Sequence, residues 1–467
     1  MTAPDHAASL EAQIDQWRSY LRRRQAIHTV DVAELEDHLR EQVAGLVGAG
    51  LSTDEAFLVA VKRMGALDAL SREFAREHSD RLWKQLVVLP SESDEPRARA
   101  RTRTDARVAF GLAVAAAVAI KVPALFGMDL MKDAGFFMRN MSLFVLPMLT
   151  GYFVWKRRPD TRTLRWLAVA FIAAVVLANV YPFAHQVPGS STHEPGSTEL
   201  LTALHLPLAL WLAVGIAYAG GRWGEVAGRM DFIRFSGELF IYYVLIALGG
   251  GVLTAFTAQI FRSIGVVADP VFQSWLIPGG AMGAVVVASW LVEAKQSVIE
   301  NMAPVLTRLF TPLFAAALIV FLAALVFTGR GVDIERNVLI AFDLLLVVVL
   351  GLLLYSVSAR DPRSRPGLFD GLQVVLLVSA LLADGVALWA IAARISEFGF
   401  TPNRVAALGE NVILLVNLAW SAVLYIGVLR GRRTFAVLER WQTDYLPVYA
   451  GWAALVVVVF PPAFGYI

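Results

Sequence analysis

The sequence predicts an all-α protein, in which a polytopic helical membrane domain of about eleven spans follows a small cytosolic helical bundle at the N-terminus. Three observations support this fold class. From Val108 onward, apolar runs of membrane-spanning length alternate with short segments rich in Pro, Gly and Arg. Hydrophobic residues make up 57% of the chain and charged residues 17%, and the mean hydropathy is +0.59. The residues before Val108 are mostly polar and charged, with the apolar spacing of short amphipathic helices.

Residues 1–88 are expected to form a four-helix domain, followed by a basic linker over 89–107 and the membrane domain over 108–467. The first predicted helix covers 9–25, and the second follows the cap residue Asp31 and ends at Gly48. The third begins with a capping box, in which Ser52 and Glu55 each satisfy a free backbone N–H. The fourth covers 67–78. The core-facing residues of the first three are Leu10, Ile14, Trp17, Leu21, Leu35, Leu39, Val43, Leu46, Phe57, Val61 and Met64.

Four segments of this head carry a family resemblance, namely 34–41 (ELEDHLRE), 50–57 (GLSTDEAF), 63–65 (RMG) and 73–74 (EF). They resemble the HAAS, or permease-prefix, family of small helical domains that precede membrane segments in bacterial proteins. The resemblance implies a cytosolic signalling role. Because such domains accompany PadR-type transcriptional regulators, it also implies such a regulator, or another cytosolic protein, as partner.

The linker over 89–107 carries five arginines directly before the first span: Arg97, Arg99, Arg101, Arg103 and Arg107. One interpretation is contact with anionic lipid, to which each basic side chain contributes about 1 kcal/mol. The favoured alternative is a topology signal within a flexible linker. Direct binding of nucleic acid is not expected, because the arginines lack interleaved aromatic residues for base stacking.

The predicted spans share the length and apolar character of membrane helices. They lie near 108–127, 138–155, 166–183, 200–219, 238–258, 276–293, 313–328, 338–357, 371–393, 409–429 and 447–462. With the head in the cytoplasm, seventeen lysines and arginines fall on inner loops and seven on outer loops. This bias follows the positive-inside rule, so we expect a bacterial inner-membrane protein with a cytoplasmic N-terminus and Ile467 outside.

Eight polar residues inside the spans all fall toward the outer side in this topology. They are Lys121, Asn179, His205, Asp343, Asp384, Glu410, Asn411 and Asn417. Each ionisable group in hydrocarbon costs at least about 2.5 kcal/mol on insertion scales, so such groups are expected to face one another or water. The depths therefore predict an outward-open polar pocket. Two alternatives stay open: Lys121 pairs with Asp384 or Asp343 to lock helices together, or several of these residues lie at headgroup level.

A second recognisable stretch, 394–404 (RISEFGFTPNR), lies between the ninth and tenth spans. It resembles the motif of a family of uncharacterised bacterial multi-pass membrane proteins, with Phe400 in place of the usual Leu of Gly-Leu-Thr-Pro-Asn-Arg. The resemblance extends over the membrane domain and includes Trp441, 445–449 (YLPVY) and 460–462 (FPP). Membership implies a fold and brings no known chemistry.

The same stretch also predicts a helix start, with Thr401 as cap and Pro402 in the first helical position. Arg404 would then lie in the first turn and favour an acidic partner, with Glu397 and Glu410 nearest. In one interpretation Arg394 and Arg404 form a clamp for an anionic ligand. The favoured alternative is a loop-to-helix latch held by a structural ion pair.

Together these arguments give a ligand-binding set of Lys121, Asn179, His205, Asp343, Asp384, Arg394, Arg404, Glu410 and Asn417. No catalytic residue, metal or cofactor is assigned. The chain has no cysteine, no Gly-x-Ser-x-Gly elbow and no Walker-type lysine loop. One further group around an outer loop has no compact metal-binding spacing: His185, His193, Glu194, Glu199 and His205.

Two amphipathic stretches, 225–238 and 297–309, are expected on the inner membrane surface, where they would face the head. The sequence therefore favours a sensory or regulatory protein that couples an outward-facing polar pocket to a cytosolic signalling head. One alternative is a secondary transporter, or permease, for a small polar or anionic solute. A membrane enzyme acting on lipid ranks last, and enzymatic activity is not favoured. The apolar stripes of the head are compatible with a homo-oligomer as well as with an internal core.

Overall fold

The computed structural model describes residues 10–11, 13–14, 29–49, 51–63, 96–130, 132–183, 195–263, 266, 269–294, 302–328, 336–360 and 366–467. The chain divides into two compact units, Met1–Arg99 and Ala100–Ile467. Within the described ranges every regular element is helical, and none of these residues lies in a β-strand. The predicted all-α class is therefore confirmed.

The first unit contains helices α2 (Thr29–Gly48) and α3 (Thr53–Arg63), which pack against each other. Their shared core buries Ile14, Leu39, Val43, Ala56 and Ala60. The 3.6-residue period of the sequence identified the first three of these, and it missed the alanines because a small side chain gives a weak apolar signal. The end of α2 at Gly48 is as predicted. Its start is not, because the helix already begins two residues before Asp31.

The predicted capping box at the start of α3 is formed. The Ser52 N–H donates to Glu55 Oε2 at 3.1 Å, and the Glu55 N–H donates to Ser52 Oγ at 3.4 Å. Two N–H groups of the first turn thus gain acceptors, which fixes the direction in which the chain enters the helix. The hydrogen bonds from Ser52 hold the pKa of the Glu55 carboxyl below its ordinary value.

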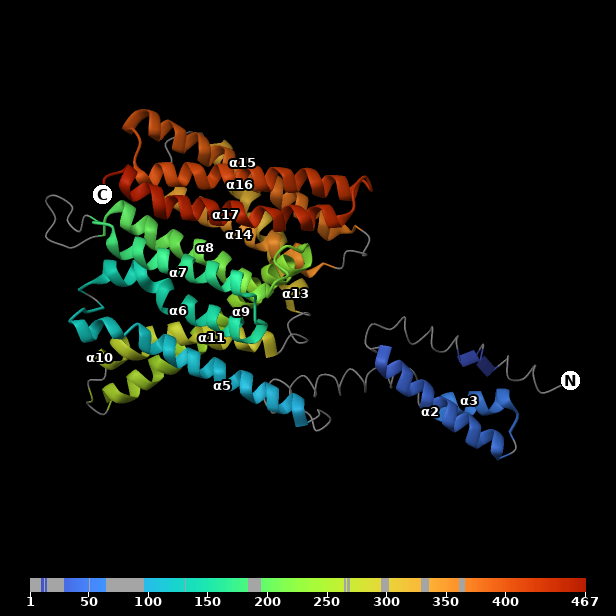
Figure 1. Cartoon of the computed structure of the whole chain (residues 1–467). Helices are drawn as coiled ribbons and strands as arrows, with labels where there is room; N and C mark the ends of the chain where they lie inside the picture. Colours follow the sequence, from blue (N-terminus) through green and yellow to red (C-terminus); the bar gives the residue numbers. More distant parts are fainter. Residues whose placement is uncertain are drawn as a thin grey trace. The chain divides into compact units, whose positions relative to one another are not determined.

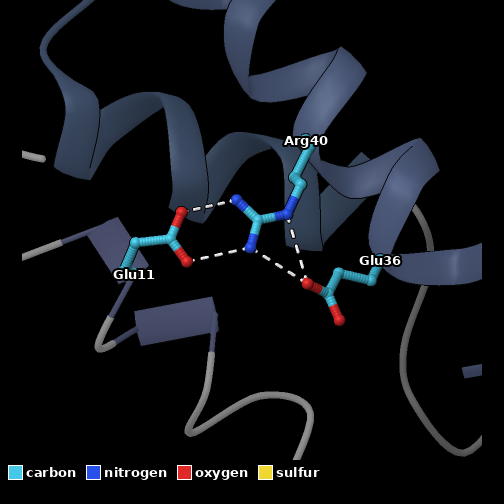
Figure 2. A network of polar contacts seen from close by, with 3 residues as sticks. All are labelled: Glu11, Glu36 and Arg40. Atoms are coloured by element: carbon cyan, nitrogen blue, oxygen red, sulfur yellow. Dashed lines mark hydrogen bonds and ion pairs between the residues drawn. The ribbon is translucent and has the colours of Figure 1, made fainter. Parts of the chain in front are cut away.

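A polar network ties the N-terminal segment of this unit to α2 (Figure 2). The Arg40 guanidinium binds both carboxylate oxygens of Glu11, at 2.6 and 2.9 Å, and also binds Glu36 one turn earlier at 2.9 Å. These two carboxylates raise the pKa of Arg40 above its ordinary value. Arg40 and Glu11 are both partly exposed, so the network contributes at most about 1 kcal/mol to stability and mainly sets the register of the two segments.

Several sequence predictions for the head lie outside the described residues. These are Trp17 and Leu21 of the first helix, Met64 at the end of the third, the fourth helix over 67–78, and the linker as far as residue 95. Helix α5 is described over Pro96–Ala119, so the arginine-rich part of the predicted flexible linker is helical.

The second unit is a bundle of long helices (Figure 1). After α5 come α6 (Ala134–Arg157), α7 (Thr161–Val180), α8 (Ser197–Ala219), α9 (Val226–Ser263), α11 (Ile277–Ala294), α13 (Met302–Thr328), α14 (Arg336–Ala359), α15 (Leu368–Phe398), α16 (Pro402–Leu429) and α17 (Phe435–Ala463). Three short elements, η1 (Val122–Phe126), α10 (Asp269–Val271) and η2 (Phe272–Leu276), lie between them. Figure 1 shows α15–α17 at one side of the bundle and α5 and α11 at the other, with α6–α8 between.

Nine helices in the described part of the chain are long and apolar enough to cross a membrane, so the chain is a multi-pass membrane protein. The nine do not include α6, nor α14, of which the apolar part described is Asp343–Ala359. Both helices nevertheless coincide with predicted spans, over 138–155 and 338–357. Each predicted span therefore falls on helical structure, and the total of eleven stays a prediction.

Two apolar cores fill the bundle. The first is formed by α5–α9 and α11 with Val457 of α17, and the second by α13–α17 and the start of α9. Phe232 and Phe235 of α9 belong to the first core, while Met230 and Ile233 belong to the second. Helix α8 packs against both α6 and α17. The start of α9 is therefore a joint between the two halves of the membrane domain.

This finding corrects the prediction that 225–238 lies flat on the membrane surface. Residues 226–263 form one 38-residue helix, which at 1.5 Å per residue is about 57 Å long. Its first turns are buried between other helices. The apolar spacing of 225–238, which predicts an amphipathic surface helix, therefore reflects burial against two cores. Of the second such stretch, 297–301 lies outside the described residues, and the remainder belongs to α13.

The glycine pairs and triplets in the spans have two different environments. A methyl group on Gly279 of α11 would lie 3.5 Å from Ala117 of α5, so these two helices pack closely there. At Gly249, Gly250 and Gly251 of α9 a methyl group would meet nothing within 4 Å. Close packing therefore does not explain the triplet, which lies on the exposed apolar half of α9.

Candidate functional site

Four ionisable residues from four helices meet at one end of the second unit. His205 lies on α8, Asp343 on α14, Asp384 on α15 and Glu410 on α16. Helix α16 packs against the other three, and α14 packs against α15. We refer to these four residues together with Asn411 of α16 as the acidic cluster. His205, Asp343 and Glu410 each lie about two turns, or roughly 12 Å, from the first residue of their helix.

His205 and Glu410 join α8 to α16. The Nε2 atom of His205 lies 2.6 Å from Glu410 Oε1, and its Nδ1 atom lies 2.8 Å from the carbonyl oxygen of Leu201. A carbonyl oxygen only accepts hydrogen bonds, so Nδ1 carries a hydrogen and donates it. The imidazole is buried, with 4% of its side chain exposed, whereas Glu410 is 36% exposed. Glu410 is thus the solvent-accessible member of the pair.

Asp343 and Asn411 join α14 to α16. The amide nitrogen of Asn411 donates to Asp343 Oδ1 at 2.8 Å and to the carbonyl oxygen of Ala407 at 2.8 Å. Its amide oxygen Oδ1 is buried and has no hydrogen-bond partner. Asn411 follows Glu410 directly, so a single turn of α16 contacts both α8 and α14.

Asp384 is the most deeply buried member of the cluster. Its exposed fraction is 0%, and neither carboxyl oxygen has a hydrogen-bond partner. Asp384 lies within electrostatic range of Asp343, which in turn lies within range of Glu410. The three carboxyl groups therefore form a continuous acidic chain from the accessible Glu410 to the enclosed Asp384.

The structure holds this cluster closed rather than as an open pocket. Asp384 and Asn411 are both fully buried. A cavity in the described part of the chain lies elsewhere, between α8, α9 and α11, and its lining contains none of the cluster residues. Apart from Ser236 its lining is made of large apolar side chains, namely Trp211, Leu239, Phe240, Tyr243 and Val285. This cavity opens on the apolar surface and offers no polar chemistry.

Besides the two arginines of the 394–404 motif, three residues of the predicted ligand-binding set lie apart from the acidic cluster. Lys121 lies over the ring of Trp275, with its ammonium 5.0 Å from the ring centre. Its expected pairing with Asp384 or Asp343 is therefore not formed. Asn179 pairs with Asn140 of α6 through two amide–amide hydrogen bonds, and Asn417 receives no charged partner.

Asn417 instead belongs to a second, uncharged group. Its amide donates to Gln442 of α17 at 3.3 Å, and Gln442 donates to Ser421 at 2.6 Å. All three residues are fully buried. Glu410, Asn417 and Ser421 have helical spacings of seven and four residues, so they lie on one face of α16. That spacing is the sequence signal by which Ser421 could have been found.

Arg404 of the 394–404 motif is bound by the backbone of this chain, and the anion clamp of Arg394 and Arg404 stays a prediction. Arg404 donates to the carbonyl oxygens of Phe398 and Gly399, at 3.1 and 2.9 Å, and lies over the Phe398 ring. The predicted latch is therefore present, but backbone carbonyls replace the expected carboxylate. Helix α16 begins at Pro402 as predicted, with Thr401 as N-cap, although the Thr401 hydroxyl makes no capping bond. Arg394 lies nearby on α15 and is partly exposed.

The histidines and acids near the outer loop are distributed among other partners. Glu199 is buried and forms an ion pair with Arg139, and His205 pairs with Glu410. His185, His193 and Glu194 lie outside the described residues. The described members of this group thus have protein partners of their own.

Comparison with family models, with curated proteins and with solved structures finds no match to this chain. The resemblances of the head and of the 394–404 motif therefore remain predictions.

Proposed function

We propose that this chain is a sensory or regulatory protein of the bacterial inner membrane, in which the acidic cluster responds to conditions on the outer side and the cytosolic head passes on the response. The excess of arginine and lysine on the opposite loops supports this orientation. One observation carries the proposal: the two helices that bring Asp343 and Asp384 into the cluster are held by arginines at their other ends.

Those contacts lie far from the cluster. Arg234 of α9 donates to the carbonyl oxygen of Ser358 in the last turn of α14, and Arg360 pairs with Asp370 in the first turn of α15. Asp343 and Ser358 are separated by fifteen residues, or about 22 Å along the helix axis. A rigid helix that shifts at one end must shift at the other, so α14 and α15 connect the cluster with the opposite side of the bundle.

The start of α9 receives this connection. Arg234 lies between Ile233, which belongs to the second core, and Phe235, which belongs to the first. A displacement of Ser358 therefore acts on the segment that joins both halves of the domain. This provides a two-site coupling with named contacts at each end, which is what an allosteric argument requires.

Amide hydrogen exchange on the full chain tests the coupling. We expect Asp384→Asn to change the exchange of amides in 226–239, about 20 Å or more from the substitution. The matched control is Ser379→Ala, a buried polar residue of the same helix outside the cluster. Exchange that changes only around Asp384, or changes equally in the control, would refute the coupling.

A second experiment tests the signalling role of the head. The full chain is purified from native membrane in mild detergent, and co-eluting proteins and small molecules are identified by mass spectrometry. A cytosolic regulator that co-elutes with the full chain and is lost when residues 1–88 are removed supports signalling. A full chain that retains no protein through the head argues against it.

Secondary transport is the other candidate, and one observation favours it. Buried polar groups continue from the cluster toward the opposite side, first at Asn417, Ser421 and Gln442, and then at Gln373, which donates to Thr311 and Ser356 at 3.1 and 3.0 Å. Such a column can line a path when helices separate. The acidic character of the cluster favours a cationic or neutral solute over an anionic one. Solute uptake by proteoliposomes that is lost in Asp384→Asn, with no partner bound to the head, would favour transport.

A further inference from the structure

We infer that the ligand of the acidic cluster is the proton, with one proton held between His205 and Glu410 and a second on Asp384. This inference deepens the proposed function and depends on it for its biological meaning. The geometry that supports it is independent of any coupling to the head.

The first proton follows from the donor and acceptor roles of the two ring nitrogens of His205. Because Nδ1 donates to the Leu201 carbonyl, a neutral imidazole would present a lone pair at Nε2. Glu410 Oε1 lies only 2.6 Å from Nε2. Two lone pairs at this distance repel, so a hydrogen lies between the two atoms. The pair is either imidazolium with carboxylate or imidazole with carboxylic acid, and both forms contain one proton more than neutral imidazole with carboxylate.

The second proton follows from the acceptors that have no donor. Asp384 has two buried oxygens without a partner, and the Asn411 amide oxygen is a third in the same cluster. An ionised carboxylate enclosed without a partner costs several kcal/mol, whereas a neutral carboxylic acid costs much less. What these oxygens lack is a hydrogen donor. A proton on Asp384 removes the charge of this buried carboxyl group.

Among the contacts of the cluster that the structure describes, none is with a lysine or an arginine. Two titratable groups on the helices that pack around the cluster have other partners: Glu199 of α8 pairs with Arg139, and Arg404 of α16 donates to backbone carbonyls. Arg394 and Tyr449 lie further along α15 and α17. In the described residues of α13 from 309 to 324, and in α9 between Tyr243 and Arg262, there is no titratable side chain. An anion would meet only acceptors here.

A metal ion fits less well than a proton. Among the described residues no three His, Asp or Glu side chains are grouped closely enough to hold one. A proton needs only a single carboxyl group, and Glu410, with 36% of its side chain exposed, is the most accessible member of the His205–Glu410 pair. Each binding step adds one hydrogen ion from water to a carboxylate or imidazole, with no electron transferred.

Infrared difference spectroscopy and potentiometric titration of the full chain in nanodiscs test the inference. Between mildly acidic and mildly alkaline pH, we expect the carbonyl stretch of a buried carboxylic acid to disappear in the natural chain. Asp384→Asn should lack that band and should release one proton fewer per chain. The control is Asp444→Asn, an exposed carboxylate paired with Arg229, which should keep the band.

A second variant keeps the test decisive if Asp384→Asn does not fold. Glu410→Gln removes the carboxylate that shares a proton with His205, and its partly exposed position makes it tolerant of substitution. We expect the imidazole ring vibrations of His205 to shift in this variant, because the carboxylate that shares the proton is gone. Unchanged bands and proton counts in both variants would overturn the inference. A band that follows sodium concentration at fixed pH would also overturn it, in favour of a cation site.

The outcomes separate this inference from the proposed function. If the carboxyl groups titrate as expected but Asp384→Asn does not change amide exchange at 226–239, the proton site is supported and the coupling is refuted. A change of exchange in Asp384→Asn without a titrating carboxyl group leaves the coupling standing and removes the proton as ligand.

Discussion

The paired amides of Asn140 and Asn179 offer a sharp test of how polar residues are held in this membrane domain. Each side-chain nitrogen donates to the other residue's oxygen, at 2.9 and 2.8 Å, and joins α6 to α7. Asn140 is buried, whereas Asn179 lies exposed in the last turn of α7. Sequence depth alone placed Asn179 in a ligand pocket. The geometry instead predicts a structural role with an asymmetric response to substitution.

The magnitudes follow from what each substitution leaves behind. An interhelical hydrogen bond in a membrane contributes about 0.6 kcal/mol on average, so the reciprocal pair contributes about 1.2 kcal/mol. Asn179→Leu loses both bonds and leaves the buried Asn140 oxygen without a donor, which adds about 1 kcal/mol or more. Asn140→Leu loses the same bonds but leaves an amide that water can reach. We therefore expect losses of about 2 and about 1 kcal/mol in the free energy of unfolding.

The double variant, with leucine at both positions, removes both partners and leaves no orphaned group. Its loss should be well below the sum of the single losses, by at least about 1 kcal/mol. Reversible unfolding in mixed micelles with increasing SDS fraction measures all three free energies. If the single losses add in the double variant, or if Asn140→Leu costs more than Asn179→Leu, the reasoning from burial is wrong.

Two further predictions concern backbone and capping positions. Gly228→Ala would place a methyl group 2.3 Å from the backbone oxygen of Arg222, so its melting temperature should fall, whereas Gly250→Ala meets nothing within 4 Å and should gain about 0.5–1 kcal/mol from helix propensity. Asp160 caps α7 by accepting from the Thr163 N–H at 3.1 Å, and its hydrogen bonds with Thr163 lower the pKa of its carboxyl below 3.8. The cap is therefore present above pH 3.8 and is lost as the pH falls through the lowered pKa. Hydrogen exchange of the amides in the first turn of α7, measured as a function of pH, should show this loss. Asp160→Asn should remove that pH dependence.

The fold was largely predictable because its strongest determinants are local. The length of an apolar run decides whether a helix can span a bilayer, and each predicted span coincides with helical structure. The capping box at Ser52 was predictable for the same reason, since its hydrogen bonds stay within one turn. The burial of 226–238 was not, because a helix between two cores and a helix on a membrane surface show similar periodicity.

The site was predictable only in depth. Distance along a span placed His205, Asp343, Asp384 and Glu410 at one level, which the structure brings together. The rotation of each helix about its axis is set by packing and is not visible in one sequence. For this reason, depth along the span also placed Lys121 in the predicted pocket, although its side chain lies over the Trp275 ring.

The 394–404 motif explains how α16 acquires the rotation that the cluster needs. Arg404 holds the last carbonyls of α15, Gly399 adopts a φ of 76° that favours glycine, and Pro402 fixes the first helical residue. Because this turn is fixed at both ends, the side chain of Glu410, about two helical turns after Pro402, points in a defined direction. Glu410 then faces His205, and Asn411, displaced by about 100°, faces Asp343. A motif that contributes no ligand atom thus positions the two residues on which the acidic cluster depends.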